Sequence, residues 1–185
     1  MSPSFFFMSA RIAKLAAVPA LAALALFSVA CGRPFDVKTP PGFVELDNQE
    51  PQYGYRAMAP EGVVIAVRVV DIADEQSDMD FWTKAVTIRM RQLNGYALLG
   101  SSDVVALDGT KGKELQFGHD ENAKPYLYRV RMFVAQQRLF IVEAGGQKDN
   151  MIRYKASVDW SLESVRVQCS AILAPVLASR TCNKW

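Results

Sequence analysis

Short runs of alternating apolar and polar residues follow one another from position 35 onward, and such alternation predicts β-strands. The strongest run, VVIAVRVVDI at 63–72, has β-branched residues on both faces and one cation, Arg68. This pattern is typical of a central strand that is covered on both sides. The other predicted strands are 35–37, 43–46, 53–58, 103–107, 113–117, 126–134, 139–143 and a last short one at 165–167.

Two segments have the spacing of helices. In the first, at 78–94, one stripe is formed by Met79, Trp82, Val86, Met90 and Leu93, and it is widened by Phe81, Ala85 and Ile88. Asp78 and Asp80 suit the positively polarised start of this helix, and Asn94-Gly95 suits its end. The second helix is predicted at 149–163.

Turn residues join several of these strands into hairpins. Asp108-Gly109 and Gln136-Gln137 are the turns of two predicted hairpins. In the strand at 126–134, alternation places the tyrosines on one face and Arg129 and Arg131 on the other. Glu114, on the neighbouring strand, is a partner for either arginine.

The order of elements predicts an α+β domain at 35–167, with a mainly antiparallel sheet of six or seven strands and helices on both faces. The length of 185 residues, with 50% apolar and 22% charged residues, fits one globular domain. Arg11 and Lys14 are the charged residues of the first thirty, so the rest of the chain has 19 cations, 19 anions and no net charge. We therefore do not expect nucleic-acid binding, which usually needs a basic surplus.

The first thirty residues are predicted to be a secretory signal. Residues 15–30, LAAVPALAALALFSVA, carry no charge and follow two cations, which is the order of a signal peptide. The run is shorter than the ~20 residues that span a bilayer comfortably. Met8 gives a more conventional start than Met1, and both starts stay open.

The end of this segment, FSVACG at 27–32, resembles the lipobox of bacterial lipoproteins. The resemblance implies cleavage after Ala30, lipidation of Cys31 with palmitate-like acyl chains, and a short membrane tether at 31–34. Gly32 stands where an Asp favours inner-membrane retention, so the outer membrane is favoured if the cell is Gram-negative. A secreted protein with a free thiol and an uncleaved anchor are the alternatives.

Cys169 and Cys182 lie in the tail at 168–185, which has no clear period. In an oxidising envelope two such cysteines are a candidate disulfide, and two free thiols are the alternative. A CxxC redox motif is absent, and a zinc site would need carboxylates beside these thiols and His119.

Several stretches of the body resemble the PsbP-like fold, which also occurs in DcrB-type bacterial lipoproteins. They are F-x-V-x-x-P-P-G-F at 35–43, VVALDGTKGKE at 104–114, and Y-x-Y-R-V-R-M-F at 126–133 followed by LFIV. The resemblance implies an α/β/α sandwich and a role in assembly or binding. It carries over no catalytic residue.

Candidate chemistry is sparse. His119, Asp120 and Glu121, in the segment HDENAKP, form either a metal or acid–base cluster or a solvated loop. The acidic run from Asp71 through Asp74, Glu75 and Asp78 to Asp80 either attracts calcium or caps a helix; it lacks the offsets of an EF-hand. A G-x-S-x-G elbow and a P-loop are missing from the sequence.

These observations predict a non-enzymatic lipoprotein without a cofactor or metal, which binds or assembles with another protein of the cell envelope. The alternative is a carboxylate-based small-ligand or metal-binding protein, or an enzyme, whose pocket is lined by Asp120, Glu121 or the run at 74–80.

Overall fold

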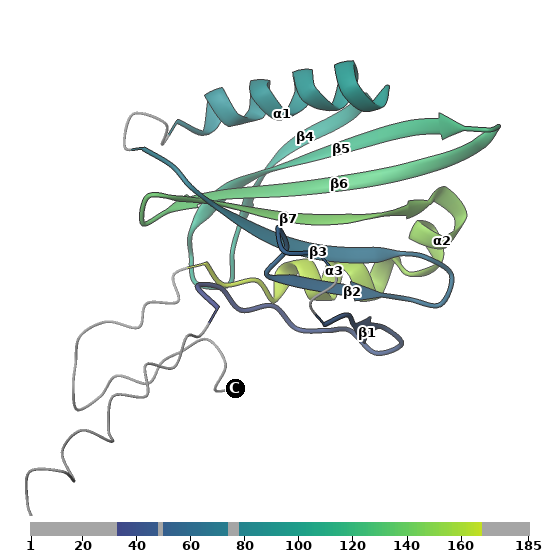
Figure 1. Cartoon of the computed structure of the whole chain (residues 1–185), viewed down its shortest axis with the longest axis horizontal. Coiled ribbons are helices and arrows are strands. Elements are labelled where there is room, and N and C mark those ends of the chain that lie inside the picture. The colour runs from purple at the N-terminus through teal and green to yellow at the C-terminus, as the bar shows by residue number, and fades with distance from the viewer. Residues whose placement is uncertain (1–32, 48–49, 74–77, 168–185) are drawn as a thin grey trace, which may run out of the picture. The chain divides into compact units, whose positions relative to one another are not determined.

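The computed structural model describes residues 33–47, 50–73 and 78–167. Within these ranges, seven strands form one antiparallel sheet in the order β1-β2-β3-β7-β6-β5-β4 (Figure 1). The strands are β1 Val44–Glu45, β2 Tyr55–Met58, β3 Val64–Asp71, β4 Ala97–Val105, β5 Lys111–Glu121, β6 Lys124–Ala135 and β7 Arg138–Gln147. The helices are α1 Met79–Asn94, α2 Lys148–Arg153 and α3 Lys155–Glu163. The predicted fold class is confirmed.

One face of the sheet packs against α1 and is called the α1 face. Buried Leu115, Phe117, Val130, Met132, Leu139 and Ile141 form its core together with Met79, Trp82, Val86 and Met90 of the helix. The predicted stripe of α1 is therefore confirmed for these four residues, and the side chain of Leu93 lies outside the described part. The predicted widening is wrong for Phe81 and Ile88, which are 49% and 54% exposed because they point away from the sheet.

Asp78 and Gly95 fix the ends of α1. The Asp78 side chain accepts a hydrogen bond from the backbone N–H of Asp80 at 2.9 Å. Gly95 adopts a left-handed conformation with φ of 65°, and its N–H donates to the carbonyl of Met90. Such a residue closes a helix with least strain when it is glycine.

The opposite face packs against α2 and α3 and is called the α3 face (Figure 1). Its core contains Ile65 and Val67 of β3, Phe133 of β6, and Phe140 and Val142 of β7, all fully buried. The predicted helix at 149–163 is divided at Tyr154 into α2 and α3.

Coverage of β3 is less complete than its sequence suggests. On the α3 face Ile65 and Val67 are buried, whereas on the α1 face Arg68 and Val70 are about two-fifths exposed. The cause is the position of α1, which contacts β4, β5 and β6. The prediction that the strand is covered on both sides is thus wrong at Arg68 and Val70, whereas Ala66 on the same face is buried.

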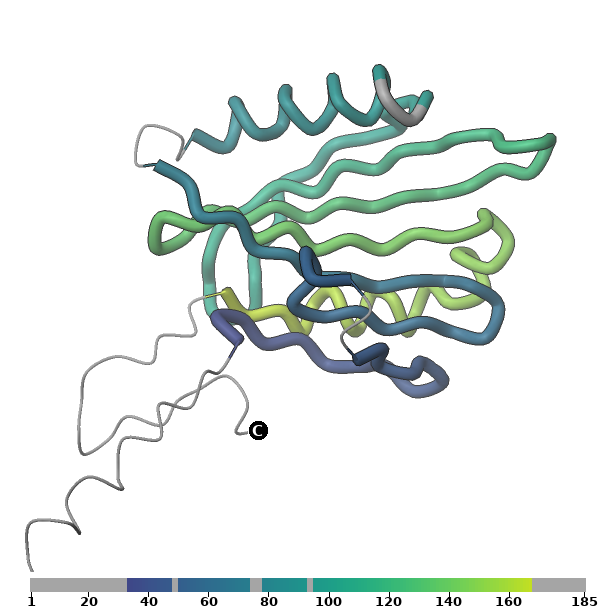
Figure 2. Tube along the Cα trace, viewed as in Figure 1, coloured from purple at the N-terminus to yellow at the C-terminus, as the bar shows by residue number. Residues whose placement is uncertain are grey.

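The chain enters the domain at the β1–β2 edge. Arg33 of the predicted tether donates a hydrogen bond to Glu45 at 2.6 Å, and its guanidinium lies 5.7 Å from the centre of the Tyr55 ring. The predicted strand at 35–37 forms only one bridge, between Asp36 and Arg166, so segments near the two ends of the described chain lie side by side (Figure 2). No helix within the described ranges is long and apolar enough to cross a membrane.

Two hairpin turns use non-glycine residues with positive φ. They are Gln136-Gln137, as predicted, and Asn122-Ala123, with φ between 51° and 62°. Two-residue turns of this kind match the twist of paired strands. The segment HDENAKP is therefore strand rather than loop outside its two turn residues, because β5 and β6 pair up to Glu121 and Lys124.

A glycine in β5 allows the close approach of β6. A Cβ on Gly112 would lie 2.3 Å from the Met132 carbonyl oxygen and 2.4 Å from Cδ1 of Phe133. We predict that Gly112→Ala lowers the free energy of unfolding by about 1–3 kcal/mol, measured by urea denaturation. Gly100→Ala is the matched control, because a Cβ there meets nothing within 4 Å. Equal losses in the two variants would contradict this account of β5 packing.

Candidate functional site

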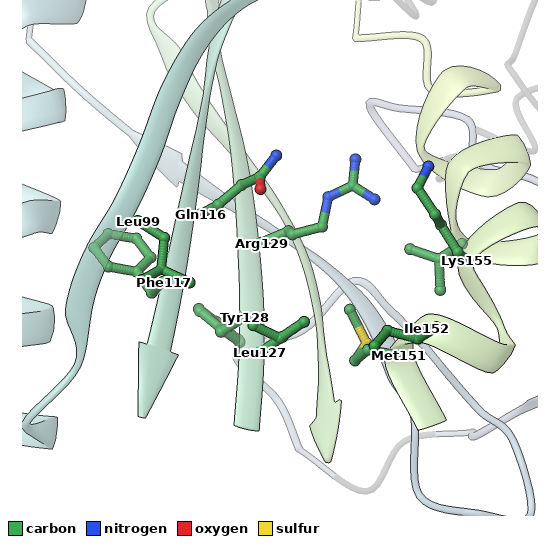
Figure 3. A pocket seen from close by; sticks show the side chains of 10 residues that line it. Leu99, Gln116, Phe117, Leu127, Tyr128, Arg129, Met151, Ile152 and Lys155 are labelled. Carbon is green, nitrogen blue, oxygen red and sulfur yellow. The ribbon is translucent and has the colours of Figure 1, made fainter. Parts of the chain in front are cut away.

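A cavity of about 240 Å³ opens between the α3 face of the sheet and the helices (Figure 3). Its lining includes the apolar residues Leu99, Leu127, Met151, Ile152 and Val158, the aromatic residues Phe117 and Tyr128, and the polar residues Gln116, Arg129 and Lys155. Figure 3 shows the polar ends of Gln116, Arg129 and Lys155 gathered at one side, away from Leu127, Met151 and Ile152. The cavity therefore has an apolar part and a polar part.

The open side of the cavity depends on an irregularity of β4. The register between β4 and β5 shifts between Leu98 and Gly100, so Leu99 is the extra residue of a β-bulge. Gly118 of β5 leaves room for it, since a Cβ there would lie 3.1 Å from Cδ1 of Leu99. Leu99 is 61% exposed and Ile152, across the opening, is 58% exposed. Two large apolar side chains thus border the entrance.

The polar part of the cavity belongs to a network of charges, which we call the Glu114 network. Glu114 is 3% exposed and accepts from Nε and Nη2 of Arg129 at 3.0 and 3.1 Å, and from Nε of Arg131 at 2.6 Å. Arg129 also donates to Asp159 of α3 at 2.5 Å, and Lys155 contacts the same carboxylate. The predicted pairing of Glu114 is confirmed, with both arginines at once.

The contacts of this network keep the carboxyl groups of Glu114 and Asp159 ionised. Burial disfavours the ionised form of Glu114, but the hydrogen bonds from Arg129 and Arg131 outweigh it and hold the pKa of the carboxyl below its ordinary range. The pKa of Asp159 is likewise lowered, since the hydrogen bonds from Lys155 and Arg129 outweigh its burial. Three cations therefore face two carboxylates, and the wall can orient a polar group of a ligand beside an apolar one.

The predicted modification sites lie outside the described residues. These sites are Ala30, Cys31, Cys169 and Cys182. The acidic segment 74–77 also lies outside the described residues. Cleavage, lipidation and the candidate disulfide stay predictions.

The predicted histidine and acidic residues are dispersed. His119 packs on Tyr96 with 4.8 Å between the ring centres, and Asp120 and Glu121 lie at the exposed end of β5. Asp71 pairs with Arg138 at 3.0 Å. Among the described residues, no three or more His, Cys, Asp or Glu side chains come together in a group that could hold a metal ion.

Sequence reasoning did not find the cavity. Its apolar residues come from β4, β6, α2 and α3, and segments more than fifty residues apart must meet before it exists. The one feature of the sequence that could have indicated the cavity is the pair Leu98-Leu99. It lies in a segment without alternation, which is typical of an exposed edge strand or a β-bulge.

The fold is similar to that of two solved structures. One is the cyanobacterial PsbP protein CyanoP from Synechocystis sp. PCC 6803, with 15% sequence identity, a TM-score of 0.54, and coverage of 72% of this chain and 86% of that one. The other is LpqN of Mycobacterium tuberculosis, a protein involved in cell envelope biogenesis, with 15% identity, a TM-score of 0.54, and coverage of 71% and 81%. No protein-family model and no curated protein matches the chain. The predicted PsbP-like fold is confirmed.

Removal of the central charge tests the Glu114 network. Glu114→Gln leaves Arg129 and Arg131 without their shared carboxylate, so we predict a loss of about 3 kcal/mol in the free energy of unfolding at pH 7. The folded-state pKa of Glu114 is lowered, so its stabilisation is present above the ordinary value of 4.5 and is lost as the pH falls through the lowered value.

Urea denaturation from pH 7 to pH 3 measures both effects. The variant should show a smaller acid-induced loss of stability than the wild type. Asp103→Asn removes a carboxylate from an ion pair with Lys113 on the surface of β4 and β5 and should have a far smaller effect. Similar losses from both substitutions would show that burial does not strengthen the Glu114 network.

Proposed function

We propose that this protein is a lipid-anchored bacterial lipoprotein that serves as a non-enzymatic binding or assembly module of the cell envelope. The anchor is supported by the apolar run at 15–30 and by Cys31 directly behind it. Acyl chains on that cysteine hold a protein at a membrane firmly, since each buried methylene contributes about 0.8 kcal/mol. If the cell is Gram-negative, the outer membrane is the favoured site.

The position of Arg33 supports a short connection to the anchor. Its contact with Glu45 fixes the chain to β1 two residues after Cys31. A lipid on Cys31 would therefore hold the domain close to the membrane.

The binding role rests on one observation, the open cavity with Leu99 and Ile152 at its entrance. Exposed apolar side chains around a concave site are typical of surfaces that bind a partner. The Glu114 network, with one more cation than carboxylates, favours a protein segment that places an acidic group beside an apolar side chain. Involvement in cell envelope biogenesis, which is reported for LpqN, is compatible with this role.

The alternative of a carboxylate-based ligand site or enzyme has no such observation in its favour. Its candidate residues Asp120 and Glu121 lie at the exposed end of β5, and 74–77 is outside the described residues. We therefore prefer binding to catalysis.

The intact mass of the protein purified from membranes tests the anchor. We expect a chain that begins at Cys31 and carries a diacyl or triacyl mass increment. Cys31→Ser should lack the increment, because the modified sulfur is gone, whereas Cys169→Ser should keep it. An unmodified mass, or a mature chain that begins elsewhere, would contradict the proposed lipoprotein.

A further inference from the structure

A second concave site lies on the other side of the sheet, on the part of the α1 face that α1 leaves open. It is a cavity of about 190 Å³ with Tyr53, Tyr96 and Tyr128 among its walls, and we call it the tyrosine hollow. Small residues of the sheet line this cavity and leave space above the strands. They are Ala66 of β3, which pairs with Glu143, and Gly145 of β7, which pairs with Tyr128.

An unusual buried charge lies in this hollow. Along β7 the residues directed to the α1 face are Leu139 and Ile141, which pack in the core under α1, and then Glu143. Glu143 is only 5% exposed, and its Oε1 lies 2.5 Å from Nη2 of Arg68. A carboxylate in this place adds nothing to the apolar core, and it lines the hollow directly.

The ion pair leaves hydrogen-bonding capacity unused. The contact between Glu143 and Arg68 lacks hydrogen-bond geometry, so the buried Oε1 of Glu143 and the buried Nε of Arg68 both have no hydrogen-bond partner. An unsatisfied buried donor or acceptor costs about 1–3 kcal/mol. Both atoms are enclosed by protein, so a ligand hydroxyl would meet the Glu143 carboxylate where this side chain lines the hollow, and it can donate to it.

The tyrosines are held in place around this pair. A Cβ on Gly145 would lie 2.6 Å from Cδ2 of Tyr128, so the glycine allows the Tyr128 ring to lie over β7. Tyr96 packs against Tyr128 with 5.8 Å between ring centres, and the Tyr53 hydroxyl donates to Oε2 of Glu143 at 3.5 Å. Burial and the nearby Glu143 raise the pKa of Tyr128 and Tyr53, so both phenols stay protonated.

The charges around the hollow are balanced. Arg68 is paired with Glu143, and Arg56, which lies over the Tyr53 ring, is paired with Glu50 at 2.6 Å. Two arginines disfavour a cationic ligand, and their two carboxylates remove the surplus that would select an anion. The hollow therefore suits a neutral molecule with both apolar and hydroxylated surfaces.

We propose that the tyrosine hollow binds a neutral sugar ring. The tyrosine rings offer apolar faces to the C–H side of the sugar, while Glu143 and the phenols hydrogen-bond its hydroxyls. The volume matches about six water molecules, which is the scale of one ring. This site lies on the opposite face from the cavity at Leu99, and it does not depend on the proposed anchor or protein partner.

Saturation-transfer NMR on the full mature protein tests the proposal. The protein is purified in a detergent without a sugar headgroup, and the probes are D-glucose, D-galactose and N-acetyl-D-glucosamine. Each is used at about 10 mM, which saturates a site with a Kd of about 1 mM. We expect transfer from the protein to at least one of the three sugars.

Variants locate the binding. Tyr53→Ala removes a wall of the hollow and should weaken binding at least tenfold, whereas Tyr126→Ala, on β6 outside the hollow, should leave it unchanged. Glu143→Gln is a second variant that keeps the shape and should also weaken binding. Circular dichroism checks that each variant is folded. Absence of transfer to all three sugars in the wild type, or equal transfer in the wild type, Tyr53→Ala and Glu143→Gln, would overturn the proposal.

Discussion

The widths of a sheet and a helix set the main constraint on this domain. Seven strands about 4.8 Å apart span about 29 Å, whereas a helix with its side chains is about 10–12 Å across. One helix therefore cannot cover a whole face of the described sheet, and α1 contacts mainly β4, β5 and β6. The residues of β7 on this face change where the cover of the helix ends. Leu139 and Ile141 lie in the core under the helix, whereas Glu143 and Gly145 line the open hollow. Concave sites arise where helix coverage ends.

The Glu114 network has a related role on the α3 face. It joins β5, β6 and α3 through Arg129, whose guanidinium contacts both Glu114 and Asp159. Burying charges is unfavourable unless each is paired and hydrogen-bonded, so the network requires α3 to take one position over the strands. That position leaves the cavity beside Leu99 open. A fixed scaffold with open, partly apolar recesses is suited to binding, which is the basis of the proposed function.

The sequence predicts the parts of this fold that depend on periodicity. Most of the strands, the half-buried stripe of α1 and the pairing of Glu114 follow from alternation or helical spacing. The first six residues of β4, 97–102, were missed because they lie at the edge of the sheet and are mostly exposed, so they have no buried face to produce alternation. The turn at Asn122-Ala123 was hidden among polar residues that also suit a loop. Neither recess could be predicted, because each depends on side chains that meet only after the sheet and helices have packed.

Photo-crosslinking in intact cells tests the central claim, that the open recess on the α3 face binds another envelope protein. A photoreactive residue is placed at position 99, at the entrance of the cavity, and at position 44 as the control. Val44 is 66% exposed and lies on β1, at the opposite edge of the sheet from β4. The account predicts a discrete protein adduct from position 99 in the membrane fraction and none from position 44. No adduct at position 99, or the same adduct from both positions, would contradict it.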